Sequence, residues 1–129
     1  MKNKSLPKSD GSSFLICEDV REEVNDKLSV IGVFPNEEIV LQKDILIPSL
    51  MAVLFARGGE GACETRILLT DPKGQMVIES PKKTIVLEKS KAYLAAIRVL
   101  VPELIVGQYN IKFFFDDKSI QRSFEVKTA

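Results

Sequence analysis

Few side chains in this sequence belong to the types that carry chemistry. The 129 residues contain no histidine, so the commonest general base and the commonest metal ligand are both missing. Cys17 and Cys63 are the candidate nucleophiles, and each would need a base and an oxyanion donor beside it. Cys17 lies inside an expected strand and Cys63 begins one, which is typical of small buried thiols. We therefore expect two free structural cysteines and no catalytic residue.

A metal ion would have to be held by oxygen atoms, since imidazole is absent and thiols are scarce. The candidate ligands form two acidic groups, namely Glu18, Asp19, Glu22, Glu23 and Asp26, and then Asp116 and Asp117. Arg21 and Lys27 interrupt the first group, and the second offers only two side chains. These patterns are typical of solvated turns, so we expect no metal site and no cofactor.

Two other motifs resemble ligand-binding features. Gly58-Gly59-Glu60-Gly61 is rich in glycine, but the Lys-Ser/Thr pair of a phosphate-binding loop is missing and no helical pattern follows it. Lysines flank the run over 84–87 on both sides, at Lys82, Lys83, Lys89 and Lys91. Such lysines can bind acidic lipid headgroups, but Glu79 and Glu88 dilute their charge. We expect a flexible turn at the glycines and a lysine-protected edge strand at 84–87.

Composition excludes further classes of function. Lys+Arg is 18 and Asp+Glu is 18, so the chain has no excess of positive charge with which to bind nucleic acid. No run approaches the roughly 20 apolar residues of a membrane span. The basic N-terminus is not followed by an apolar segment, so we expect no signal peptide and a cytoplasmic location.

Turn signals divide the chain into short runs of β character. Strands are expected over residues 14–19, 28–34, 38–47, 51–55, 63–70, 75–79, 84–87, 107–115 and 120–127. Residues 91–101 fit a strand or a helix, and the alternation of Tyr93, Ala95, Ile97 and Val99 favours the strand. Residues 1–12 have little apolar content and are expected to form a disordered tail, which leaves 13–129 as a single domain.

About eight or nine short strands separated by turns are typical of an antiparallel two-sheet β-sandwich, with a closed barrel as the alternative. The segments 106–111 and 123–126 resemble the closing hairpin of immunoglobulin-like sandwiches. The opening segments "CEDVR" at 17–21 and "KLSVIGVF" at 27–34 resemble those of a family of small bacterial proteins of uncharacterised function. This resemblance implies an immunoglobulin-like or C2-like β-sandwich in a bacterial cytoplasm, and it implies no activity.

The chain also has more apolar side chains than the two inward faces of a sandwich can bury. Met51–Phe55, Tyr93–Val101 and Phe113–Phe115 are apolar on both strand parities. This surplus predicts a non-enzymatic interaction or assembly module, and the expected partner is a protein or a second copy, with a homodimer favoured. The alternative is a small-molecule or ion-binding sensor that uses the acidic loops or the end of the sandwich.

Overall fold

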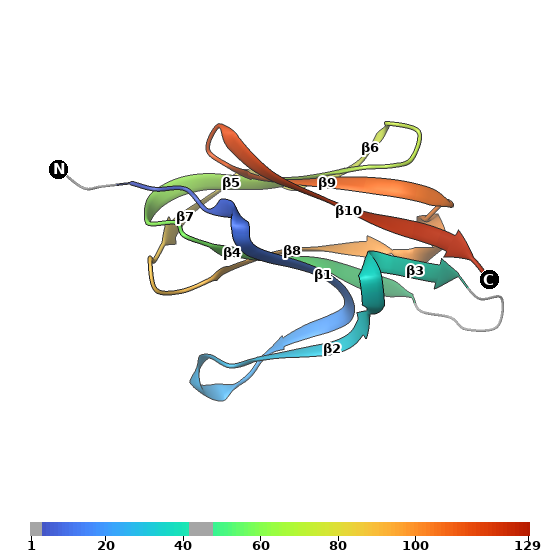
Figure 1. Cartoon of the computed structure of the whole chain (residues 1–129), viewed down its shortest axis with the longest axis horizontal. Coiled ribbons are helices and arrows are strands. Elements are labelled where there is room, and N and C mark those ends of the chain that lie inside the picture. The colour runs from blue at the N-terminus through green and yellow to red at the C-terminus, as the bar shows by residue number, and fades with distance from the viewer. Residues whose placement is uncertain (1–3, 42–47) are drawn as a thin grey trace.

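The computed structural model describes residues 4–41 and 48–129, and over these it shows two β-sheets packed face to face (Figure 1). The strands are β1 (Lys8–Glu22), β2 (Leu28–Phe34), β3 (Glu38–Leu41), β4 (Ser49–Arg57), β5 (Gly61–Thr70), β6 (Met76–Glu79), β7 (Lys83–Leu87), β8 (Tyr93–Leu100), β9 (Gly107–Phe115) and β10 (Lys118–Thr128). The sequence-based prediction of an all-β, two-sheet sandwich is confirmed.

The strands divide unequally between the two sheets. One sheet has the order β2-β1-β4-β8, and the other has the order β3-β10-β9-β5-β6 with β7 also paired to β5. Every pair is antiparallel except β3 with β10, which run parallel over 38–41 and 125–128. The expected extended piece over 38–47 is therefore a strand at Glu38–Leu41, and residues 42–47 lie outside the described residues.

Aromatic side chains from both sheets fill the space between them. Tyr109 and Phe124 stack with ring centroids 5.1 Å apart, and the Tyr109 hydroxyl accepts a hydrogen bond from the Ile105 backbone N–H at 2.9 Å. Phe14 in the first sheet contacts Phe113 in the second edge to face, at 6.1 Å. These contacts fix the alternation along β9, because its odd-numbered residues must all point inward.

Residues 91–101 resolve as a strand. The central part of this segment forms β8, which pairs with β4 over eight residues, from Tyr93 opposite Ala56 to Leu100 opposite Ser49. β4 is thus a central strand between β1 and β8, as its apolar residues on both parities predicted. Pairing with β4 satisfies the backbone of β8, which outweighs the helical preference of its alanines.

The N-terminal segment differs from the expected disordered tail over 1–12. The backbones of Ser5 and Glu60 exchange two hydrogen bonds, of 3.0 and 2.9 Å, and Pro7 is buried. β1 begins at Lys8, and the guanidinium of Arg122 donates to Ser9 and to the carbonyl of Ser12. The prediction is wrong over residues 4–12, because backbone hydrogen bonds and one distant arginine hold a segment with little apolar area.

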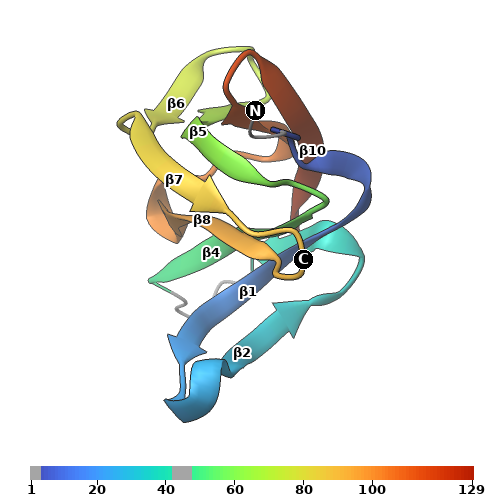
Figure 2. The ribbon, with the colours of Figure 1, turned by 90° about the vertical axis from the view of Figure 1, so that its left-hand side faces the viewer.

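The β1–β2 hairpin extends beyond the sandwich. Residues 13–17 of β1 pair with β4, and β2 pairs with residues 16–17 and 19–22, so residues 19–22 pair with β2 alone. Figures 1 and 2 both show the hairpin projecting away from the six-stranded sheet. Gly32 has a φ of +67°, and a Cβ there would lie 2.7 Å from the Glu18 side chain, so only glycine lets Glu18 cross over β2 at this point. We call residues 18–33 the arm.

The two neighbouring phenylalanines of β9 allow a test of the inward and outward assignment. Phe113 is fully buried, whereas Phe114 is half-buried on the other face under the guanidinium of Arg66, 3.9 Å from its ring centroid. Phe113→Ala should lower the free energy of unfolding by about 3–5 kcal/mol, because it leaves a cavity. Phe114→Ala should cost only about 1 kcal/mol, since it removes a solvent-facing cation–π contact. Urea denaturation of both variants measures the difference, and equal losses would contradict the assignment.

Candidate functional site

Two of the predicted acidic candidates, Asp19 and Asp116, are held by cations of the chain itself. The Asp19 carboxylate accepts hydrogen bonds from Arg98 at 3.2 Å and from Arg21 at 3.5 Å. Asp116 accepts one from the Glu64 backbone N–H at 2.8 Å and forms an ion pair with Lys4. Within residues 4–41 and 48–129, no three Asp, Glu or Cys side chains gather closely enough to share a metal ion. These ion pairs compete with a metal for the same oxygens.

Both cysteines are free and buried, as predicted. Burial raises the pKa of the Cys17 thiol and of the Cys63 thiol above the ordinary value, because the thiolate loses hydration. Raised pKa values suit inert structural thiols, since the thiolate is the reactive form.

The glycine and lysine motifs have structural roles in the described residues. Gly59 is buried, and a Cβ there would lie 2.6 Å from Leu87 Cδ1, so the loop from β4 to β5 requires a glycine for packing. The lysines lie around β7, which pairs with β5 alone in the described sheet. Lys82 approaches Glu64 at 3.8 Å and Lys91 approaches Glu88 at 3.4 Å. Charge at a sheet edge opposes pairing with a second chain.

Two surface grooves were also considered as ligand sites. One, of about 680 Å³, lies between residues 4–9 and 116–120 and includes the Lys4–Asp116 ion pair. The other, of about 510 Å³, includes Arg122, whose guanidinium already donates to three backbone carbonyls and one hydroxyl. In each groove, the charged groups just named therefore already have protein partners.

The outward side of the four-stranded sheet is the most unusual surface of the molecule. The register places residues directly opposite one another on the same face, so Val33, Cys17, Met51 and Arg98 form one row across the sheet. We use the name outer face for thirteen of these outward residues, ten of which are apolar: Leu15, Cys17, Asp19, Ile31, Val33, Ser49, Met51, Val53, Phe55, Leu94, Ala96, Arg98 and Leu100. The same register places Ser13 beside Phe55, and Arg21 opposite Ser29, at the two ends of this face.

Two residues of the outer face are completely buried although they lie outside the core between the sheets. Cys17 and Val53 are 0% exposed, yet neither belongs to the cluster of buried residues that fills the sandwich. In the strand register Val33 and Met51 flank Cys17, and Leu15 and Ala96 flank Val53. Side chains of the same face nevertheless stay open to solvent, with Val33 53% and Leu100 51% exposed. The outer face therefore behaves as half of a second hydrophobic layer.

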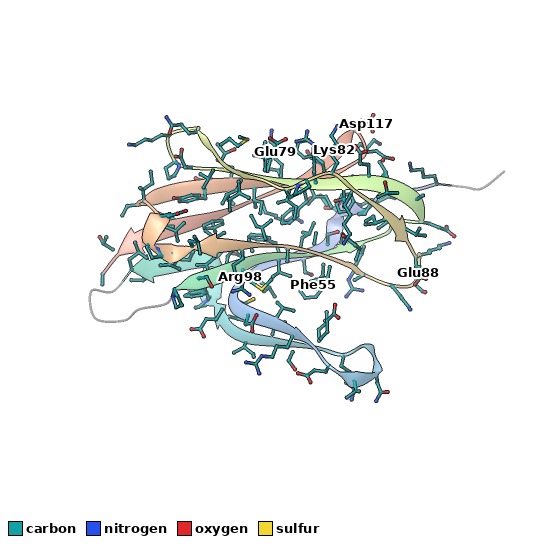
Figure 3. All side chains as sticks on the ribbon, turned by 180° about the vertical axis from the view of Figure 1, so that it is seen from behind. Phe55, Glu79, Lys82, Glu88, Arg98 and Asp117 are labelled. Atoms are coloured by element: carbon teal, nitrogen blue, oxygen red, sulfur yellow. The ribbon has the colours of Figure 1, made fainter. Side chains whose placement is uncertain are left out.

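The outward side of the six-stranded sheet is polar by comparison. There the rows across β5, β9 and β10 contain Arg66, Lys112, Asn110, Gln121 and Ser123. Figure 3 shows Glu79 and Lys82 on this side of the sandwich, with Phe55 and Arg98 on the opposite side, toward the arm. One sheet thus follows the usual pattern of a solvated outer surface and the other does not.

The polar residues of the outer face form a small network at the end of the face where β4 begins. Arg98 donates to Ser49 Oγ at 2.9 Å and to Asp19 at 3.2 Å, and the Asp19 and Arg98 side chains stay 37% and 48% exposed. Partial burial opposes ionisation of Asp19, but its hydrogen bonds, from Arg98 first, outweigh this effect and lower the pKa of the carboxyl. Asp19 is a metal candidate by sequence, and its pairing with Arg98, 79 residues away in the chain, arises only in the folded sheet.

Comparisons with known protein families and with curated protein sequences find no match to this chain. The resemblance of residues 17–34 to a bacterial family therefore stays a prediction. In the part of the chain that the structure describes, no helix is long and apolar enough to cross a membrane.

The Asp19–Arg98 pair predicts a specific pH dependence. Because the folded-state pKa of Asp19 is lowered, its contribution to stability is present above the unfolded pKa of about 3.9 and is lost as the pH falls through the folded value. In Arg98→Gln the pKa of Asp19 should rise toward the unfolded value. Titration of the carboxyl carbon by NMR measures it, and an unchanged pKa would show that Arg98 does not hold the carboxylate.

The thiols provide a second test. Cys17 and Cys63 should react with a disulfide reagent at least about tenfold more slowly in the native protein than in denaturant, because both are buried and have raised pKa values. Two thiols should titrate after denaturation without reductant. Rapid native labelling of Cys17 would mean that the outer face opens easily.

Proposed function

We propose that this protein is a non-enzymatic interaction module that buries the outer face of the β2-β1-β4-β8 sheet against a protein partner. The observation that carries the proposal is the burial of Cys17 and Val53 outside the core, under neighbours that remain half exposed. A second layer of side chains with no second sheet on it is the arrangement of an interface with one side missing.

The energetics favour such a role. Removing apolar surface from water contributes roughly 25 cal/mol per Å², so an apolar sheet face left in solvent forgoes a large stabilisation. Isolated exposed apolar side chains are ordinary, but the exposed Ile31, Val33 and Leu100 share one face with the half-buried Leu15, Met51 and Phe55. The polar opposite side shows that this chain can make a solvated sheet surface, so the apolar character of the outer face calls for another cause.

The chemistry of the candidate residues agrees with a binding role. The thiols are buried with raised pKa values, and the carboxylates of Asp19 and Asp116 are paired with cations. A nucleophile or general base needs to be accessible and poised to titrate. The two free thiols also support a reducing compartment such as the cytoplasm.

Two valine substitutions test this proposal. Val33 lies on the outer face and Val86 lies on β7, and both are well exposed, at 53% and 72%. The native protein should associate at micromolar concentration or bind a hydrophobic dye such as bis-ANS. Val33→Lys should reduce that association or binding at least about threefold, because it places a charge on the outer face, whereas Val86→Lys should leave it unchanged.

Sedimentation velocity and bis-ANS fluorescence provide the two measurements, and thermal unfolding confirms that both variants fold. The proposal is contradicted if the native protein neither associates nor binds the dye. It is equally contradicted if Val33→Lys and Val86→Lys behave alike.

A further inference from the structure

We infer that the partner of the outer face is a second copy of this chain, in a two-fold dimer in which the arm of each protomer lies over the outer face of the other. This inference rests on the proposed function and adds the identity of the partner. Three observations carry it: the area that the outer face offers, the apolar residues on the arm, and the placement of Asp19 and Arg98.

The outer face alone is too small for a stable interface. Four strands spaced about 4.8 Å apart, with about seven residues of roughly 3.3 Å each, span a sheet face of roughly 450 Å². Stable interfaces bury about 800 Å² on each partner. A dimer that uses the outer face therefore needs a further contact from each protomer, and the structure contains one feature that extends beyond the sheet, namely the arm (Figures 1 and 2).

The arm has the apolar character that this contact requires. Of its residues, Ile31 and Val33 continue the outer face along β2, Leu28 is 40% exposed on the opposite side, and Val24 at the tip is 83% exposed. The arm and the outer face occur together in one chain. Two copies related by a two-fold axis can therefore cover both features at once, each arm on the other copy's sheet.

The charges on the outer face are self-complementary. Asp19 on β1 and Arg98 on β8 lie on either side of the central strand β4. A two-fold axis that lies in the interface, parallel to β4, exchanges the two sides, so that Asp19 of one copy faces Arg98 of the second copy. The chain has a formal net charge of +0, so two copies also meet without overall repulsion.

Association through strand edges is less suitable. The edge strand β2 contains Gly32 with a φ of +67°, which takes the backbone out of the extended conformation in the middle of the strand. The edge strand β7 is flanked by lysines. Both features hinder the addition of a strand from another chain at these two edges.

Charge reversal at positions 19 and 98 tests the arrangement. In Asp19→Arg, positions 19 and 98 are both positive, and in Arg98→Asp both are negative, so each variant should dimerise at least about tenfold more weakly than the native chain. In an equimolar mixture, position 19 of each variant meets an opposite charge at position 98 of the other. Sedimentation velocity should then show recovery of the dimer, and native mass spectrometry should show it to be mixed.

The mixture distinguishes contacts between copies from contacts within one. Mixing cannot relieve the repulsion within each chain, because positions 19 and 98 of that chain keep like charges. Recovery therefore reports only the contact across the interface. The double variant Asp19→Arg, Arg98→Asp restores both contacts, so it should dimerise alone and serves as the control for folding.

The other outcomes separate this inference from the proposed function. A native monomer whose dye binding is lost in Val33→Lys would overturn the second copy as partner and would leave the proposed function standing. A native dimer that the mixture does not restore would overturn the two-fold arrangement. A native monomer that binds no dye would overturn both.

Discussion

The structure depends on β4, a strand whose side chains are apolar on both faces. Leu50, Ala52 and Leu54 point between the sheets and are fully buried, and Val53 points the other way and is fully buried as well. Such a strand is stable only in the centre of a sheet and only if both faces are covered. The six-stranded sheet covers one face. On the other, the neighbouring strands β1 and β8 supply a partial cover from their own outward side chains.

The six-stranded sheet, which covers the inward face of β4, is held in place by aromatic packing and by one arginine at the edge of the sandwich. The Tyr109–Phe124 stack and the Phe14–Phe113 contact set the inward alternation of the strands that bear them. At the edge where β10 passes β1, the inward-facing residue is Arg122, and its guanidinium donates to carbonyls of both strands. The arginine takes the place of an apolar contact there, because the irregular start of β1 leaves backbone carbonyls that need donors.

The outer cover is incomplete, and the proposed interaction rests on this observation. The arm departs from the sandwich where β4 begins, beside Gly32, whose φ of +67° takes β2 out of the extended conformation. Ile31, Val33 and Leu100 are left in solvent beside the Asp19–Arg98 pair. An apolar sheet face with one ion pair at its end is suited to a specific interface, since the apolar area supplies the stabilisation and the charges fix the orientation.

The sequence by itself determined the strands and the surplus of apolar side chains. The alternation in 107–115 and the two-sided run at 51–55 follow from residue types alone, because strand period and turn residues are local properties. It did not determine the parallel pairing of β3 with β10 or the ordering of residues 4–12, since both depend on hydrogen bonds to residues more than 50 positions away. Nor could it show that the surplus gathers on one side of one sheet, because Cys17, Val53 and Arg98 become neighbours only through the strand register. Register is a property of the assembled sheet, so the tertiary structure alone decided where the outer face lies.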